Sequence, residues 1–380
     1  MNHIIGAQDA APVHQRGARS VAGAEPARTG GKAQARSLLV DEESDGQRLD
    51  NFLARHLKGV PKAHIYRIIR SGEVRLNKGR SDAQTRVAAG DLVRLPPLRE
   101  SESARQKSQA MEQAVLAPGG LVAGEALAPV VLYEDEHLLA LDKPSGVAVH
   151  GGSGISFGVI ERVRMARPQA RFLELVHRLD RETSGVLLVA KKRAALTALQ
   201  EQFRDRGTGK TYLALVAGDW PARKKLIDTP LRKFLIEGPT GEERRVRAAR
   251  HGEEDAKSAV TLVKVAHRLD DCTLLEVTIK TGRTHQIRVH LADAGHPILG
   301  DAKYGDFEVN KGLAKASQGS GLRRMFLHAW RLGFDHPASG ERLLIESPLP
   351  SELQTFLDGR SSGPSTPSFR IKASAHAQTL

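Results

Sequence analysis

Cysteine is almost absent from this sequence, since Cys272 is the only one in 380 residues. A single thiol can form neither a disulfide framework within one chain nor a thiolate metal cluster, so a reducing, cytoplasmic setting is expected. Long apolar runs are absent as well. No stretch approaches the roughly 18 apolar residues that a membrane span needs, and the opening residues lack the apolar core of a signal peptide. We therefore expect no membrane partner.

Acidic residues are outnumbered, with 44 Asp and Glu against 57 Lys and Arg and a formal charge of +13. This excess favours a polyanion over a neutral small molecule as the partner, although a merely soluble basic protein would have the same composition. With 40% hydrophobic residues, a chain of 380 residues can bury at least one sizeable core. Two domains with tails are the expected organisation.

Changes in composition along the chain predict the domain boundaries. Residues 1–36 are rich in Ala, Gly and Arg and contain no aromatic residue, which predicts a disordered tail. Residues 100–128 are polar and then rich in small residues, without a sustained period, and are predicted to be a linker. Residues 358–380 have the composition of a second disordered tail. The folded domains are therefore expected at 37–99 and 129–357.

Two short amphipathic helices are predicted in the first domain, because the apolar residues of GQRLDNFLARHLKG and of PKAHIYRIIRSGE each lie on one helical face. The segments VRLN and GDLVRLP follow as predicted strands. Between Gly46 and Leu95 there are 11 Arg or Lys and 4 Asp or Glu. In IIRSGEVRLN and AAGDLVRLP this α+β unit resembles the S4 RNA-binding domain, which implies RNA contacts by Lys62, Arg67 and Arg70. A solvated basic helix face is the alternative.

The second domain alternates predicted strands and helices. In VVLYEDEHLLALDK two apolar strands flank an acidic turn, and SAVTLVKVAHRLDDCTLLEVTIKTG has the pattern of a hairpin. The segment RAALTALQEQFRDRG is a predicted helix followed by the strand TYLALVAGDW, and HQIRVHLADAG is a helix that ends at Gly295. The predicted fold class is α+β.

Two familiar signatures are present only in part. GTGKT at 207–211 resembles the end of a phosphate-binding loop, but Arg204 stands where that loop needs its first Gly, and the predicted order is helix then strand. His285 and His290 are five residues apart, so they are badly placed to share a metal ion on either a helix or a strand. A metal-dependent nuclease would need ligands that are distant in the sequence.

The tetrapeptide HRLD occurs twice, at 177–180 and at 267–270. The second copy is followed by Asp271 and an apolar strand, and a polar hairpin tip explains all its features. The first copy lies in LELVHRLDRETSGVLLVAKK, where two apolar strands are joined by far more polar functionality than a turn requires. The first copy is therefore the candidate site.

HRLDRETSG resembles the catalytic motif of the RluA-type family of RNA pseudouridine synthases, and other segments follow in that family's order. LDKPSGVAVHGGSG precedes it, while KTYLALV, TGRTHQIRVHLADAGHPILGDAKYGD and FLHAWRLGF follow. The match covers roughly 130–350. The resemblance implies a mixed-sheet catalytic domain, and an S4-like domain in front is the arrangement of bacterial enzymes that act on large-subunit (23S) ribosomal RNA. The segments HGGSG, YGD and FLHA are most similar to the C-type branch of this family.

The chemistry of this family requires a carboxylate near the glycosidic bond, a closed pocket, and removal of the uridine from its stack. The resemblance assigns the carboxylate to Asp180 and a cation that keeps it ionised to Arg283. It places Arg178 in the gap left by the flipped base or on the phosphate backbone. It sets the ring of Tyr212 and the side chain of Leu327 against the uracil, although core packing would account for either of the last two alone.

The reaction changes no redox state and consumes no energy, so neither a cofactor nor a metal is expected. The expected partner is large-subunit ribosomal RNA, free or in an assembling particle, and the chain is expected to be a monomer. The rival hypotheses are a non-catalytic RNA-binding protein that retains the fold and a metal-dependent RNA hydrolase.

Overall fold

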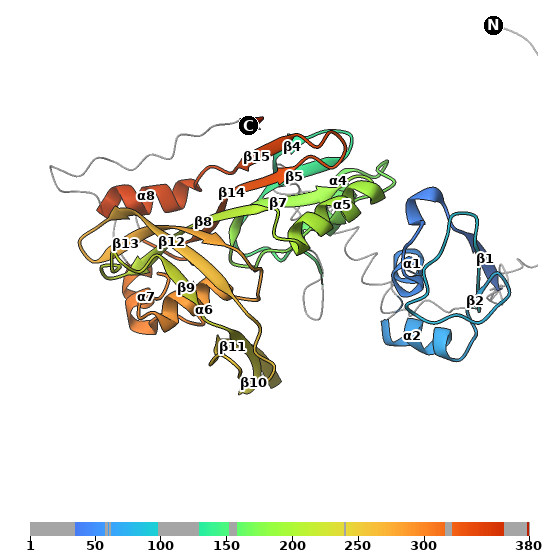
Figure 1. Cartoon of the computed structure of the whole chain (residues 1–380), viewed down its shortest axis with the longest axis horizontal. Coiled ribbons are helices and arrows are strands. Elements are labelled where there is room, and N and C mark those ends of the chain that lie inside the picture. Colours follow the sequence, from blue (N-terminus) through green and yellow to red (C-terminus); the bar gives the residue numbers. More distant parts are fainter. Residues whose placement is uncertain are drawn as a thin grey trace, which may run out of the picture.

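The computed structural model describes residues 35–57, 60, 62–97, 129–151, 158–238, 241–315, 321–360 and 378–379. They form a small N-terminal domain, which ends at residue 97, and a larger C-terminal domain, which begins at residue 129 (Figure 1). The predicted linker and nearly all of the predicted N-terminal tail lie outside the described residues. Within the described ranges, no helix combines the length and the apolar character that crossing a bilayer requires.

The N-terminal domain is a three-stranded antiparallel sheet with two helices, and the strand order is β1, β3, β2. Both predicted helices and both predicted strands are confirmed, whereas β1 was not predicted because its four residues are too few to show a period. Phe52 and Leu53 of the first helix pack with Ile65 and Ile68 of the second in a buried core. The elements are β1 (Arg36–Leu39), a 3-10 helix (Glu42–Ser44), α1 (Leu49–His56), α2 (Lys62–Arg70), β2 (Arg75–Leu76) and β3 (Leu92–Leu95).

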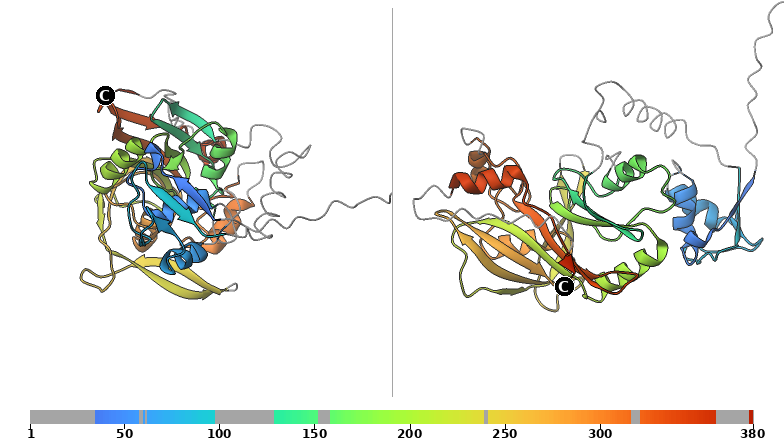
Figure 2. Two further views of the ribbon diagram at one scale, coloured as in Figure 1. Left: turned by 90° about the vertical axis from the view of Figure 1, so that its right-hand side faces the viewer. Right: turned by 90° about the horizontal axis from the view of Figure 1, so that it is seen from above.

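The C-terminal domain is built on one large sheet with helices on both faces, as two further views of the ribbon show (Figure 2). The strands of the domain, of which β10 and β11 form a separate hairpin, are β4 (Val130–Glu134), β5 (Leu138–Lys143), β6 (Glu174–Leu175), β7 (Ser184–Ala190), β8 (Gly209–Ala217), β9 (Leu226–Asp228), β10 (Leu231–Gly238), β11 (Gly241–Ala248), β12 (Val260–Arg268), β13 (Cys272–Ile279), β14 (Leu327–Asp335), β15 (Arg342–Glu346) and β16 (Gln378–Thr379). Its helices are α4 (Val159–Ala166), α5 (Arg193–Arg204), α6 (Gln286–Asp293), α7 (Phe307–Ala314) and α8 (Ser351–Arg360).

The main path of the sheet runs β4, β5, β7, β14, β8, β13, β12, β9. β7 and β14 pair in parallel at the centre, and the other described neighbours pair antiparallel. The sheet is therefore mixed and the fold class is α+β, as predicted. The acidic turn between β4 and β5, the β12–β13 hairpin, and the α6 helix with Gly295 just beyond it are also confirmed.

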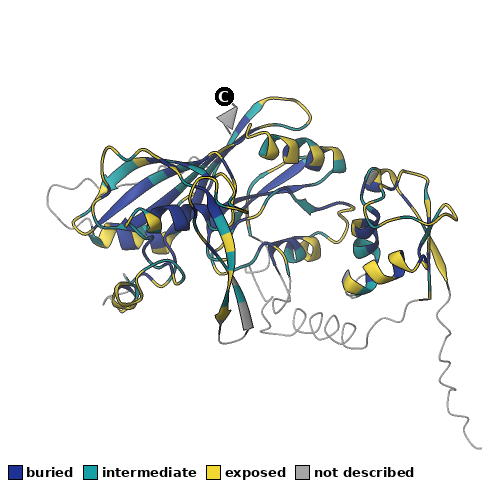
Figure 3. Cartoon of the chain, turned by 60° about the horizontal axis from the view of Figure 1, so that its bottom comes forward, coloured by how far each residue is buried: buried dark blue, intermediate teal, exposed yellow. Residues whose placement is uncertain are grey.

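β7 is buried along its whole length because both faces of the sheet are covered there. Its Val186 and Leu188 pack in the core that contains Leu196 and Leu199 of α5, whereas Leu187 faces the core beneath α4. A strand that is covered on both sides has a continuous apolar run instead of alternation. Figure 3 shows the result, with dark central strands and exposed outer helix faces. This fully buried strand begins at Ser184, shortly after the first HRLD copy.

A two-stranded hairpin, β10 and β11, projects from the body of the C-terminal domain (Figure 1). Its strand β11 contacts the segment after α6. Lys303 forms an ion pair with Glu243 of β11, and the backbone N–H of Val246 donates to the Tyr304 hydroxyl at 3.3 Å. Strand β11 is therefore connected to a segment that also borders the candidate site described below.

The predicted C-terminal boundary at residue 357 is too early. α8 continues to Arg360, where its side chain pairs with Asp271 and adds a stabilising contact across the domain. Gln378 and Thr379, also assigned to the tail, pair with β15 as β16. Residues 361–377 and 380 of this predicted tail lie outside the described residues.

Candidate active site

Asp180 lies in the short connection between β6 and β7, and the first HRLD copy is held in place by its histidine. The His177 ring is stacked on Phe203 with a centroid distance of 4.7 Å, and its Nε2 accepts a hydrogen bond from the Leu188 N–H at 3.1 Å. Burial lowers the pKa of His177 to about 3, so the ring is uncharged at neutral pH and serves as a structural acceptor. The connection that carries Asp180 is thereby fixed to β7 and α5.

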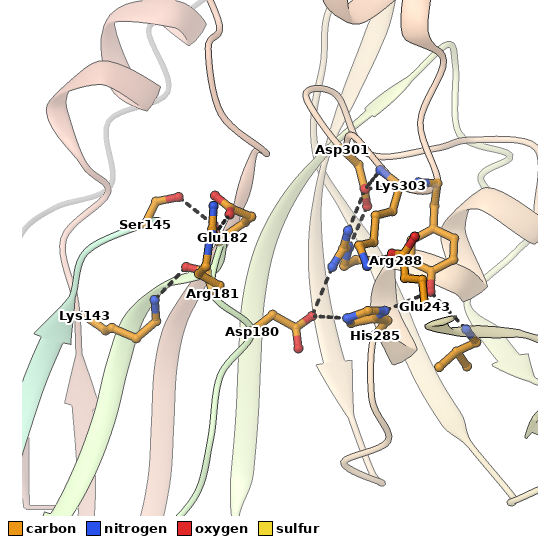
Figure 4. Close-up of polar contacts among 12 residues, drawn as sticks. Lys143, Ser145, Asp180, Arg181, Glu182, Glu243, His285, Arg288, Asp301 and Lys303 are labelled. Atoms are coloured by element: carbon orange, nitrogen blue, oxygen red, sulfur yellow. Dashed lines mark hydrogen bonds and ion pairs between the residues drawn. The ribbon is translucent and has the colours of Figure 1, made fainter. Parts of the chain in front are cut away.

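The LDKPSG segment fixes the other side of the same connection. The buried Lys143 Nζ donates to the carbonyl oxygens of Pro144, Val147 and Arg181 at 2.8, 2.7 and 3.0 Å. Ser145 Oγ donates to the Glu182 carbonyl at 2.8 Å, and Figure 4 shows both segments side by side. Burial lowers the pKa of Lys143 to about 7. The residues that follow Asp180 are therefore held by direct contacts with the preceding motif.

The cation next to Asp180 is Arg288, from the first turn of α6 (Figure 4). Its Nη1 donates to Asp180 Oδ2 at 3.4 Å, and its Nε and Nη2 donate to the two oxygens of Asp301 at 2.7 Å each. Burial would lower the pKa of Arg288, but the hydrogen bonds and charge of Asp301 outweigh it and the pKa is raised. Arg288 is thus a buried, permanently charged bridge between two carboxylates.

The prediction that Arg283 is the ion partner of Asp180 is wrong. Arg283 is exposed in the loop before α6, and its Nε donates to the Ser258 carbonyl at 3.1 Å. One signal in the sequence could have identified Arg288. It stands between the apolar residues Ile287 and Val289 in the predicted helix HQIRVHLADAG, which indicates burial, and a buried arginine almost always has an acidic partner.

A pocket of about 120 Å³ opens beside the Asp180 carboxylate. All five residues of this domain that the sequence analysis selected for catalysis or substrate binding line it: Arg178, Asp180, Tyr212, Arg283 and Leu327. A neighbouring groove of about 520 Å³ shares three of them, Arg178, Tyr212 and Arg283. The pocket is below the several hundred Å³ that drug-sized ligands usually occupy, so it suits one small planar group, with room for adjoining groups in the groove.

Tyr212 and Leu327 come from neighbouring strands at the centre of the sheet. Tyr212 of β8 packs against two of the hydrophobic clusters of the domain, and Leu327 is buried at the start of β14. Burial, together with the negative charge of Asp180, raises the pKa of Tyr212. Its hydroxyl therefore keeps its proton at neutral pH and can donate it. The position of Tyr212 is compatible both with core packing and with a role in the pocket.

The second HRLD copy has no such surroundings. His267 and Arg268 end β12, and Asp270 is exposed at the turn before β13. The Asp271 side chain forms an ion pair with Arg360 of α8, and its backbone carbonyl accepts a hydrogen bond from the Gly218 N–H at 2.8 Å. This copy is a hairpin tip, as predicted.

The two histidines weighed as metal ligands have separate partners. His285 Nδ1 lies 2.8 Å from the Tyr304 hydroxyl, while His290 contacts Thr261 Oγ1 at 2.8 Å and the Thr229 carbonyl at 2.9 Å. Among the residues that the structure describes, no three His, Cys, Asp or Glu side chains are grouped as a metal site would require.

Comparisons with known proteins identify the family. Residues 137–293 match the family model described as RNA pseudouridylate synthase, and residues 47–93 match the S4 domain. Ribosomal large subunit pseudouridine synthase C of Salmonella typhimurium is 52% identical over 320 residues, which cover 84% of this chain and 95% of the relative. The chain belongs to the RNA pseudouridylate synthase family.

The same relative from Escherichia coli is 51% identical to this synthase over 84% of the chain and 95% of its own length. Among solved structures, human RNA pseudouridylate synthase domain containing 4 is 29% identical, covers 66% of this chain and 97% of its own, and has a TM-score of 0.48. The family models and the two bacterial relatives confirm the predicted family, the S4 domain and the enzyme class. The hypothesis of a non-catalytic RNA-binding protein is therefore set aside.

The S4 domain of the synthase presents part of its predicted RNA-binding face to solvent. Arg67 and Arg70 are exposed on α2, opposite the buried Ile65, Ile68 and Ile69. The side chain of Lys62 lies outside the described residues, although its backbone begins α2. An exposed basic helix face is suited to contacts with phosphates, which supply most of the sequence-independent affinity for RNA.

Proposed function

We propose that this synthase converts uridines of large-subunit ribosomal RNA to pseudouridine, with Asp180 as the catalytic carboxylate. The observation that carries the proposal is the position of Asp180, which is fixed by neighbouring motifs, paired with a buried arginine, and open to a small pocket. The names of the relatives, ribosomal large subunit pseudouridine synthase C, support the substrate. A cytoplasmic monomer acting on free RNA or on an assembling particle is consistent with this role.

The proposed reaction begins when a uridine leaves its stack and its base enters the pocket. The Asp180 carboxylate attacks the ribose or removes a proton beside the glycosidic bond, and the permanently charged Arg288 pairs with one of its oxygens in a partly enclosed site. The N1–C1′ bond breaks, the uracil turns, and C5 bonds to C1′ as the ribose leaves the Asp180 carboxylate or takes its proton back. C5 loses a proton and N1 gains one, so the reaction is balanced without an external reactant.

The remaining pocket residues are assigned to binding and proton handling. Leu327 and the ring of Tyr212 would contact the two sides of the uracil, and the Tyr212 hydroxyl would serve the late proton step at C5. Arg178 and Arg283 are exposed at the rim that the pocket shares with the groove, where they can hold the phosphates that flank the flipped nucleotide or fill the gap it leaves.

The proposed substrate is tested by a pseudouridine map of ribosomal RNA. Cells that lack the protein should lose pseudouridine at specific positions of the large-subunit RNA, and the intact protein should restore them. Restoration by the Asp180→Asn variant, or losses confined to the small-subunit or transfer RNA, would contradict the proposal.

Removal of residues 1–97 should weaken RNA binding and reduce its dependence on salt, because the S4 domain contributes a basic excess, with 11 Arg or Lys against 4 Asp or Glu between Gly46 and Leu95. Each phosphate contact that is lost removes roughly one unit from the slope of log affinity against log salt concentration. Titrations of a ribosomal RNA fragment at several salt concentrations measure both quantities. Arg67→Ala with Arg70→Ala should reproduce part of the loss in the full chain. Equal slopes for intact and truncated proteins would exclude this role.

A further inference from the structure

His285, which the sequence analysis considered only as a metal ligand, lies against the catalytic carboxylate (Figure 4). Its Nε2 is 3.9 Å from Asp180 Oδ2, and its side chain is only 16% exposed. It stands immediately before α6 with a φ of 53°, in the left-handed region that a residue other than glycine occupies at a cost. Backbone strain of this kind at an active site often holds a side chain in the position that its function requires.

The other ring nitrogen of His285 is engaged by a connected set of donors. Tyr304 accepts the Val246 N–H at its hydroxyl oxygen, and the hydroxyl lies 2.8 Å from His285 Nδ1. Among the described residues, Nδ1 is the one acceptor within hydrogen-bond distance of the Tyr304 hydroxyl hydrogen. Nδ1 of a neutral ring is therefore the acceptor, and the ring proton belongs on Nε2, which faces Asp180.

The charges around His285 favour the neutral ring. Burial lowers the pKa of His285, and the cations Arg288 and Lys303 lower it further, whereas the carboxylates Asp180 and Asp301 oppose the change. The net direction is downward, so at neutral pH the imidazole carries one proton. A neutral ring can donate a hydrogen bond to the carboxylate without competing with Arg288 for its charge.

Both neighbours of the Asp180 carboxylate approach the same oxygen. Arg288 Nη1 and His285 Nε2 lie 3.4 and 3.9 Å from Oδ2, and no described residue makes a polar contact with Oδ1. We propose that His285 is a positioning residue, fixed by Tyr304, whose Nε2–H donates to Asp180 Oδ2 in the RNA complex and leaves Oδ1 as the reacting oxygen. Catalytic hydrogen bonds are often long in the free enzyme and shorten when substrate binds, so closure needs a movement of about 1 Å.

The inference rests on the proposed role of Asp180 and is tested with two amide variants of His285. The amide nitrogen of His285→Gln reaches approximately the place of Nε2, whereas that of His285→Asn reaches only the place of Nδ1. We expect Gln to lower the single-turnover rate of pseudouridine formation by at most about 3-fold and Asn by about 10-fold or more, the usual effect of losing a hydrogen bond to a charged group. RNA affinity should change little in either.

If His285 had a purely structural role, the single-turnover rates of the two variants should rank in the opposite order. Asn tolerates the left-handed backbone better than Gln, so Asn should then be the more stable and also the more active variant. A rate for His285→Asn that equals or exceeds that of His285→Gln overturns the inference. Tyr304→Phe provides a second measurement should both His285 variants fail to fold. It should slow single turnover several-fold at unchanged RNA affinity, and an unchanged rate overturns the inference too.

Asp180→Asn serves as the reference in the same assay. An active Asp180→Asn enzyme would remove the proposed catalytic role and with it the basis of the inference. An inactive Asp180→Asn enzyme, combined with equal rates for the two His285 variants, would leave the proposed function intact and reject the role of His285 alone.

Discussion

Asp180→Asn should abolish pseudouridine formation by the synthase while the protein still folds and still binds RNA. The exchange replaces a carboxylate with an amide of similar size, so the group that attacks or takes a proton is lost. Arg288 retains both hydrogen bonds to Asp301, and the oxygen of the new amide can still accept from its Nη1. The cost in stability should therefore be at most about 1 kcal/mol.

The repeated tetrapeptide provides a matched control for Asp180→Asn. Asp270→Asn makes the same chemical change in the second HRLD copy, where the side chain is exposed at a hairpin tip. Surface changes of this kind usually alter stability by about 0.5 kcal/mol or less, and the rate should stay within a small factor of the parent. Pseudouridine yield and melting temperature are measured for both variants. An inactive but well-folded Asp270→Asn protein would show that the wrong copy was selected.

Much of the fold could be predicted because its signals are local. The helical period of α1, α2 and α5 and the continuous apolar runs of β5 and β7 are visible in the sequence. The order of the strands could not be derived in this way, since β7 pairs in parallel with β14, whose first residue is Leu327. Such a pairing depends on contacts across more than a hundred residues, which no local period reveals.

The site could be predicted only in part, because some of its residues lie in local motifs whereas other contacts depend on tertiary packing. Asp180 and Tyr212 were assigned from motifs that are continuous in the chain, and both line the pocket. The ion partner depends on how the chain packs around the start of α6. Arg283 and Arg288 stand in one short segment, and only the packing of α6 exposes the first and buries the second beside Asp301. Tertiary packing, not the motif, decides which arginine reaches the carboxylate.

Arg288→Gln should both inactivate the enzyme and destabilise it strongly. The change leaves Asp301, which is 1% exposed, without a cation, although the N–H groups of Lys303 and Tyr304 still donate to it at 2.8 and 3.1 Å. Breaking a buried pair in this way costs about 3–5 kcal/mol. For a domain of this size that corresponds to a decrease of roughly 6–20 °C in melting temperature. Arg283→Gln, which changes an exposed arginine, should alter the melting temperature little.

The double variant Arg288→Gln with Asp301→Asn separates the structural role of the arginine from its catalytic role. Both charges of the buried pair are then removed, so much of the stability should return. Activity should not return, because Asp180 still lacks the cation that pairs with its Oδ2. A double variant that forms pseudouridine at the parental rate would show that Arg288 acts only on the fold.

The pH dependence of stability checks the same pair independently. Burial alone would raise the pKa of Asp301, but the hydrogen bonds and charge of Arg288 and the N–H groups of Lys303 and Tyr304 lower it below its ordinary value of 3.8. A carboxyl whose pKa is lowered by folding stabilises the protein above its ordinary pKa, and that contribution disappears as the pH falls through the lowered value. The double variant has no such carboxyl. The stability difference between parent and double variant, measured by denaturant unfolding, should therefore be constant near neutral pH and should narrow below about pH 4. A difference that stays constant down to about pH 2 would mean that the Asp301 carboxyl does not contribute in its ionised form.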